Sequence, residues 1–278
     1  MKNILILSNF ESYSKNAIDY TLQLCRGQAC HFNFLNIVKV WSYTSDDLMA
    51  AKPQQAIYDS ILSDSKTQLQ HLVSDLRSRY KEENYLFSAL TDYDVFTDAI
   101  QQAVENYHID YIVMGADGTS NLIERIFGSH STRVLRNVAC PVLIVPKGYR
   151  YEKTSKVLLV LDQSNVYNSG MAQKLVDLFP NDKLEVSVLR LSQNDPIHQQ
   201  EELAAIARDF DQKDIPYFKM PEAEVQKGSL LKTVDAVTHA QFNVVLTQPQ
   251  SLLHRLVASS GVSDIILNIE RPTLFLKH

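Results

Sequence analysis

The chain has 278 residues, a length that suits two domains of about 140 residues each better than a single core. Apolar residues make up 45% of it and charged residues 21%, as in average soluble globular proteins, and no apolar run approaches the roughly 18 residues of a membrane span. The net charge of −5 comes from dispersed acidic residues without a basic patch, so we expect neither nucleic acid nor a membrane as partner.

Short apolar runs alternate with helical spacing in the first half of the chain. The predicted strands are residues 4–7, 32–40, 85–90, 110–114 and 141–145, and the predicted helices are 17–24, 53–80 and 96–107. This alternation requires parallel strands joined by crossovers, which bury the sheet on both faces. The pattern therefore predicts a doubly wound α/β layer.

The second half repeats this order after a polar linker at residues 148–155. Its predicted strands are residues 157–161, 184–191, 217–220, 242–246 and 273–276, and its predicted helices surround 175–179, 197–210 and 230–238. Self-comparison aligns Ile4–Asn9 with Val157–Asp162 and Cys140–Val145 with Arg271–Leu276. We therefore predict two domains, residues 1–148 and 149–278, that form a tandem repeat.

The three cysteines and the first residues of the chain indicate a cytoplasmic location. Cys25, Cys30 and Cys140 show neither CxxC spacing nor an even-numbered disulfide framework, which fits reduced thiols and argues against a metal site. The apolar run Ile4–Leu7 is shorter than a signal-peptide core and no small-residue cleavage site follows it, so we interpret it as a strand.

A glycine motif follows the fourth predicted strand, with the pattern G-x2-G-x9-G-S-x-S from Gly115 to Ser131. Gly115 and Gly118 leave the carboxyl end of a strand, where open parallel sheets place ligands, and the missing Cβ lets a ligand approach the backbone. Gly128 and Ser129 then precede a short helix whose free N–H groups favour an anion. The motif predicts a lysine-free phosphate cradle; the alternative is that Ser129 simply caps the helix.

This motif resembles the signature of the universal stress protein family, as do the flanking segments Ile112–Gly115 and Ala139–Pro146. The resemblance implies an α/β fold of two doubly wound, parallel, five-stranded sheets with strand order 3-2-1-4-5, similar to the adenine nucleotide alpha hydrolases. It also implies that ATP, with or without Mg²⁺, lies across the strand ends. AMP or another adenosine derivative is the alternative ligand.

The resemblance also assigns ligand-binding positions. The implied cofactor-binding residues are Ser8, Asn9, Ile37, Met114, Gly115, Gly118, Gly128, Ser129, His130 and Ser131. Ile37 would contact adenine through its backbone, and Met114 would flank the ribose or base. His130 would bind phosphate, although a histidine in such a loop is more often solvated than a phosphate ligand. Ser8 and Asn9 stand where the family usually has a Thr-Asp pair, so this chain brings no charge to the adenosine.

The second copy has lost most of the motif. Its equivalent segment, residues 247–263, lacks the upstream glycines, although Asp162 retains the acidic residue that the first copy lost. We predict a structural role for this half, with the fifth strands of the two halves pairing within the chain; a homodimer remains open.

The leading hypothesis is an ATP-binding stress-response module. The sequence contains no Walker A motif, no GxGxxG fingerprint and no GxSxG nucleophile elbow. No nucleophile–base pair or carboxylate cluster is evident either, so we assign no catalytic or metal-binding residue. The alternatives are a nucleotide-independent interaction or scaffold module and a very slow ATP hydrolase.

Overall fold

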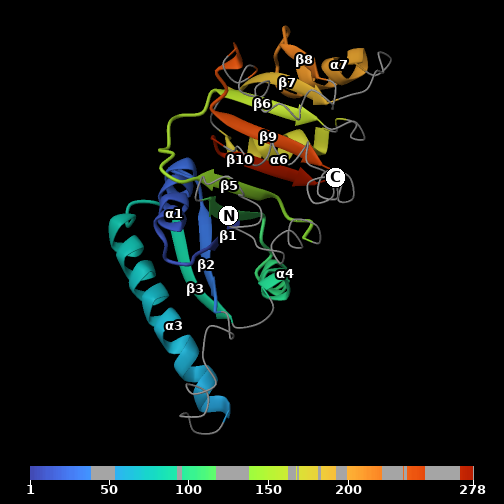
Figure 1. The fold of residues 1–278 in the computed structure, drawn as a ribbon. Helices are drawn as coiled ribbons and strands as arrows, with labels where there is room; N and C mark the ends of the chain where they lie inside the picture. Colours follow the sequence, from blue (N-terminus) through green and yellow to red (C-terminus); the bar gives the residue numbers. More distant parts are fainter. Residues whose placement is uncertain are drawn as a thin grey trace.

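The computed structural model describes residues 1–38, 54–92, 96–116, 138–161, 167, 169–180, 183–191, 199–220, 234, 237–247 and 270–277. Within this part of the chain, ten strands form one continuous sheet with helices packed on both faces (Figure 1). None of the described helices is both long and apolar enough to span a bilayer.

The first half has the predicted strand order. Its elements are β1 (Lys2–Leu7), α1 (Ser12–Leu24), β2 (Cys30–Ile37), α3 (Gln54–Arg79), β3 (Tyr85–Asp92), α4 (Phe96–Asn106), β4 (Tyr111–Ala116) and β5 (Val142–Pro146). The strands lie in the order β3-β2-β1-β4-β5, and all neighbours within this half are parallel. Ile4, Leu5 and Ile6 are at most 1% exposed, because helices cover both faces of a parallel sheet. The predicted fold class is confirmed.

The second half has the same order of strands along the chain. Its elements are β6 (Lys156–Leu161), α6 (Ser169–Leu178), β7 (Glu185–Leu191), α7 (Gln199–Asp209), β8 (Tyr217–Met220), β9 (Phe242–Thr247) and β10 (Thr273–Lys277). They lie in the order β8-β7-β6-β9-β10, again with parallel neighbours. His108 and His239 occupy the same place before β4 and β9, and both adopt a left-handed backbone, with φ of 48° and 50°.

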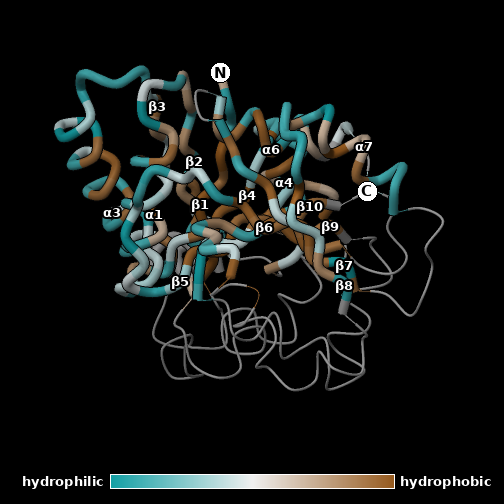
Figure 2. The backbone as a smooth tube through the Cα atoms, turned by 90° about the horizontal axis from the view of Figure 1, so that it is seen from above, coloured by the Kyte–Doolittle hydropathy of each residue, from teal (hydrophilic) through white to brown (hydrophobic). Residues whose placement is uncertain are grey.

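Two apolar clusters fill the space between the sheet and its helices. One lies on the face that carries α1, α3, α6 and α7, and the other lies on the face that carries α4. Figure 1 shows α1 and α3 on one side of the first-half strands and α4 on the other. In Figure 2 the hydrophobic positions gather along the central strands, whereas outer turns and helix ends are hydrophilic. The two clusters therefore show that both faces of the sheet are packed, with α4 opposite α1 and α3 in the first half and with α6 and α7 on one face in the second half.

The two halves meet through β5 and β10 and through the end of α6. β5 and β10 are antiparallel neighbours, with Leu143 opposite Leu274. Side chains of the first half donate hydrogen bonds to main-chain carbonyls of α6: Lys2 Nζ to Asp177, and the Tyr111 hydroxyl to Lys174 at 2.7 Å. The carbonyls in the last turn of a helix lack partners within it and attract cations, so the contact of Lys2 with Asp177 stabilises the α6 terminus as well as the junction.

The connection between the halves is held against both of them. The Tyr149 ring packs edge-on against Tyr20 of α1, with the ring centroids 6.0 Å apart. The Asn16 side chain donates to the Tyr149 carbonyl at 3.2 Å, and the Tyr149 hydroxyl donates to the Gln241 carbonyl at 3.0 Å. The segment that the sequence marks as a polar linker thus carries specific contacts.

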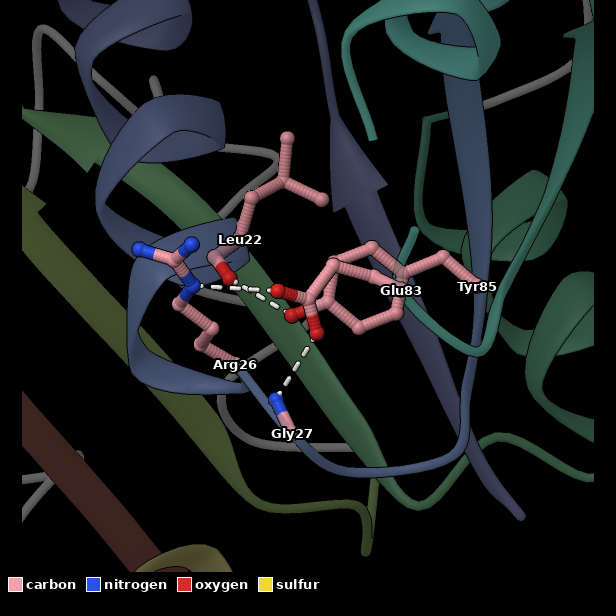
Figure 3. A network of polar contacts seen from close by, with 5 residues as sticks. All are labelled: Leu22, Arg26, Gly27, Glu83 and Tyr85. Carbon is pink, nitrogen blue, oxygen red and sulfur yellow. Dashed lines mark hydrogen bonds and ion pairs between the residues drawn. The ribbon is translucent and has the colours of Figure 1, made fainter. Parts of the chain in front are cut away.

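A network of polar contacts fastens the turn after α1 to the start of β3 (Figure 3). The Glu83 carboxylate accepts hydrogen bonds from Arg26 Nε and from the Gly27 N–H, both at 3.0 Å. Gly27 has a φ of 75°, a left-handed conformation that glycine adopts without steric cost. The Tyr85 hydroxyl donates to the Leu22 carbonyl at 2.8 Å.

Replacing Tyr85 with phenylalanine tests this network with little change in shape. The hydrogen bond between Tyr85 and the Leu22 carbonyl is buried, so its loss leaves that carbonyl without this donor. We expect Tyr85→Phe to lower the free energy of unfolding by about 1 kcal/mol, measured by urea denaturation. The matched control is Tyr107→Phe at an exposed position, which should stay within about 0.5 kcal/mol of wild type.

His31 should make stability depend on pH. Burial lowers the pKa of His31, whose Nε2 lies 2.7 Å from the Ser88 hydroxyl. The unfolded chain therefore binds this proton more readily than the folded protein, and the free energy of unfolding falls as pH drops below the usual histidine pKa of about 6.5. We expect His31→Gln to lose less stability than wild type between pH 7.5 and pH 5, by denaturant unfolding.

A second histidine variant controls for the His31 experiment. His71 is exposed on α3, and His71→Gln removes a histidine without altering a buried contact. If His31→Gln and His71→Gln both follow the wild-type pH dependence, burial of His31 does not contribute to acid sensitivity.

Candidate functional site

The carboxyl ends of β1 and β4 form the switch point of the first sheet. From β1 the connections run outward to β2 and β3, whereas β4 and β5 lie on the opposite side of β1. Open parallel sheets bind ligands in the crevice outside the strand ends at such a point. The structure brings to this edge Ser8 and Asn9 after β1, Ile37 at the end of β2, and Gly115 near the end of β4.

Ser8 is fixed by its main chain. Its N–H donates to the Leu35 carbonyl at 2.9 Å, and its carbonyl accepts a hydrogen bond from Asn36 Nδ2 at 2.6 Å. The Asn36 Oδ1 in turn accepts from the Ser65 hydroxyl of α3 at 2.7 Å. Ser8, Asn36 and Ser65 are all buried, so this network holds the ends of β1 and β2 against the middle of α3.

The sequence pattern did not mark Asn36 or Ser65 as residues of the site. Asn36 interrupts the apolar run of β2, and Ser65 stands on the buried face of α3. A polar residue at a position that the pattern assigns to the core signals a buried hydrogen-bonded partner, because an unsatisfied buried amide is costly. That signal could have indicated the network, but it names no partner.

Asn9 organises the turn between β1 and α1. Its Oδ1 accepts a hydrogen bond from the Glu11 N–H at 3.2 Å, and its Nδ2 donates to the Tyr13 hydroxyl. Phe10 inside the turn has a φ of 65°. The hydrogen bond from the Glu11 N–H to the Asn9 side chain closes this turn in place of a main-chain acceptor. Asn9 is therefore already engaged on both sides of its amide group.

Gly115 has a packing role that the sequence did not reveal. Helix α1 crosses β4 at this residue, and a Cβ here would overlap the main-chain carbonyl of Tyr13 and stand 3.0 Å from the amide nitrogen of Ser14. The close approach at Gly115 is thus with helix α1. Its predicted contact with a ligand stays a prediction.

Ile37 and Met114 border the apolar cluster on the α4 face. Met114 is 4% exposed and belongs to that cluster, and Ile37 is half-buried against it. Beyond Ile37, the Val38 N–H donates to the Asp92 carbonyl at 2.8 Å, which ties the ends of β2 and β3 together. Contact of Ile37 or Met114 with a nucleotide stays a prediction.

The remaining predicted ligand positions lie outside the described residues. They are Gly118, Gly128, Ser129, His130 and Ser131. The same holds for Asp162 and for residues 248–263 of the second half. The assignment of the phosphate cradle therefore rests on the sequence.

The second half replaces the Asn36 network with an ion pair. Arg190 stands in β7 where Asn36 stands in β2, and its Nη1 lies 3.1 Å from Glu202 Oε1 of α7. The Tyr217 hydroxyl donates to the other Glu202 oxygen at 2.9 Å. The two side chains of the ion pair are only 13% and 5% exposed, so each half fastens its second strand differently.

The described residues offer little for metal or nucleophilic chemistry. Within the described ranges, no group of three or more His, Cys, Asp and Glu residues could hold a metal ion. Cys25, Cys30 and Cys140 are buried and form no disulfide bond. A hydrogen bond with Cys30 and burial raise the pKa of Cys25, so this thiol stays protonated at neutral pH.

A doubly wound sheet with its switch point at β1 and β4 belongs to a class of α/β folds that bind ligands outside the strand ends. Comparison with known proteins identifies the family within this class. The model of the universal stress protein family matches residues 1–146, just over half of the chain. The chain therefore belongs to the universal stress protein family.

Solved structures resemble the chain over almost its whole length. A universal stress protein from Archaeoglobus fulgidus DSM 4304 has 13% identity and a TM-score of 0.69, and the match covers 99% of this chain and 96% of that one. A functionally unknown protein from Pseudomonas aeruginosa PAO1 has 15% identity and a TM-score of 0.61, with 99% and 92% covered. These similarities concern the fold. No curated protein matches the chain in sequence.

A solved structure that is not named as a universal stress protein has a similar fold over almost the whole chain. The cytoplasmic domain of a prokaryotic cation chloride cotransporter has 10% identity and a TM-score of 0.52, and the match covers 99% of this chain and 94% of that domain. A fold of this kind therefore also occurs in a protein that is not named as a universal stress protein.

Proposed function

We propose that this protein is an adenine-nucleotide-binding module of the stress response, with one ATP site in residues 1–148. The observation that carries the proposal is the edge at the β1–β4 switch point, where Ser8, Asn9 and Ile37 stand beside the strand that opens the glycine motif. Hydrogen-bonding groups next to an apolar residue suit a nucleoside. The motif from Gly115 to Ser131 would receive the phosphates, with or without Mg²⁺.

The second half, residues 149–278, completes the molecule in this proposal. It lacks the upstream glycines of the motif, and its α6 terminus accepts hydrogen bonds from Lys2 and Tyr111 of the first half. Its role is to pair with the first half inside one chain, as a second copy of the same domain. We place the protein in the cytoplasm, in keeping with its buried cysteines, which form no disulfide bond.

Calorimetric titration with ATP, with and without Mg²⁺, tests the nucleotide site. We expect wild type to bind ATP, and at about 100 times the dissociation constant ATP should raise the free energy of unfolding by about 2.7 kcal/mol. Gly128→Val should abolish both effects, because side-chain atoms would fill the proposed phosphate cradle. Gly115→Val is unsuited to this test, because its side chain would collide with α1.

The control for this titration is Lys81→Met, an exposed exchange beside Glu82 on the turn before β3. It should bind ATP like wild type. Absence of heat from wild type at millimolar ATP would refute the nucleotide site and favour a scaffold module. Release of ADP or AMP faster than in buffer would instead indicate a slow hydrolase.

A further inference from the structure

Asn9 and Tyr13 form a hydrogen-bonded polar pair at the switch point. Asn9 follows β1, and Tyr13 lies in the first turn of α1. The Asn9 amide donates to the Tyr13 hydroxyl, so the side chain of Tyr13 is anchored beside the end of β1. Tyr13 is half-buried, which leaves part of its ring accessible.

The main chain of Tyr13 places the pair between β1 and β4. Its carbonyl lies against Gly115, where a Cβ would overlap it. Tyr13 therefore touches the end of β4 through its backbone and the end of β1 through its hydroxyl. These are the two strands that border the crevice in which doubly wound sheets bind ligands.

The hydrogen bond from the Glu11 N–H to Asn9 shows which end of the Asn9 amide faces Tyr13. The Glu11 N–H can only donate, and it points to the Asn9 oxygen at 3.2 Å. The NH₂ group of Asn9 therefore faces Tyr13, and the tyrosine oxygen is the acceptor. Because the hydroxyl accepts from Asn9, its own proton is directed elsewhere and remains available as a donor.

The pair carries no charge. Glu11 and Lys15 are exposed and stand one helical turn apart on either side of Tyr13, so their charges offset each other. A carboxylate beside a ribose accepts hydrogen bonds from its hydroxyls and repels a phosphate on the same ribose. An uncharged amide with a phenolic donor does neither, and its O–H can donate to a phosphate oxygen.

We propose that Tyr13, held in place by Asn9, forms the ribose subsite of the nucleotide site, and that this subsite accepts adenine nucleotides with a phosphate ester on a ribose hydroxyl as well as on the 5′ position. The inference rests on the proposed nucleotide site and names its ligand class. Tyr13 is the residue that determines specificity, because its hydroxyl donates to the additional phosphate.

Calorimetry with AMP and with adenosine 2′,5′- and 3′,5′-bisphosphate tests the subsite. For wild type we expect at least one bisphosphate to bind about tenfold more tightly than AMP, the gain from one hydrogen bond to a charged group. Tyr13→Phe should remove this gain and change AMP affinity by less than about threefold. Asn9→Asp should reverse the preference, because its carboxylate would repel the phosphate and turn the tyrosine proton toward itself.

Controls separate a failure of this inference from a failure of the nucleotide site. Tyr107→Phe, an exposed exchange at the end of α4, should keep the wild-type preference, and thermal melts should show that every variant is folded. If wild type binds AMP but binds both bisphosphates more than tenfold more weakly, the nucleotide site stands and the ribose subsite is refuted. If wild type binds none of ATP, AMP and the two bisphosphates, both proposals are refuted.

Discussion

Replacing Gly115 with alanine is expected to lower the free energy of unfolding by about 3 kcal/mol, at the upper end of the cost of overpacking a core. The added methyl group would overlap the Tyr13 carbonyl, a main-chain atom that cannot rotate away as a flexible side chain could. Relief requires α1 to shift on β4, and that shift would disturb the packing of Ala17 and Ile18 in the core. Urea denaturation followed by circular dichroism measures the loss.

Gly148→Ala is the matched control for this exchange. Gly148 has a φ of 77°, and a Cβ there would meet no atom within 4 Å. Its substitution should cost only the left-handed strain, about 1 kcal/mol. A Gly115→Ala variant as stable as wild type would show that α1 does not press on β4 as described.

Replacing Arg190 with methionine is expected to cost about 3 kcal/mol of unfolding free energy, because the Glu202 carboxylate would stay buried without its cationic partner. The Tyr217 hydroxyl would remain as a donor to Glu202 but cannot neutralise its charge. The double variant Arg190→Met with Glu202→Leu should regain most of the loss, since apolar residues of similar size often replace buried ion pairs at little cost. Denaturant unfolding of the three proteins measures this coupling.

An exposed pair in the same chain provides the comparison. The Lys81–Glu82 pair is 75% and 87% exposed with 3.9 Å between its charged atoms, so Lys81→Met should change stability by less than about 0.5 kcal/mol. Equal effects of Lys81→Met and Arg190→Met would contradict the view that burial makes the Arg190 pair important.

The strands and helices could be predicted because burial on both faces leaves a plain mark in the sequence. Val157–Leu161 and Val142–Val145 are continuous apolar runs, and the described strands β6 and β5 occupy them. The pairing order needed the family resemblance, because apolar runs alone do not say which strands are neighbours. The observed order β3-β2-β1-β4-β5 agrees with what the resemblance implied.

The candidate site could be predicted only in part. Glycine is scarce in this chain, so the glycine motif drew attention to Gly115. The neighbour that requires a glycine there, Tyr13, lies about a hundred residues away in sequence, and no periodicity connects the two. Asn36 and Ser65 escaped for the same reason, since hydrogen bonds between a strand and a distant helix depend on how the elements pack. Local patterns report the face that a residue occupies and leave its partner unspecified.

The antiparallel contact between β5 and β10 also limits how the protein can associate with other chains. Both strands have neighbours on each side, so the described sheet ends at two margins, the eight-residue β3 and the four-residue β8. Only unpaired strand edges can recruit another strand through main-chain hydrogen bonds. A strand of another chain could therefore join the described sheet only beside β3 or β8, because β5 and β10 already pair with each other within one chain.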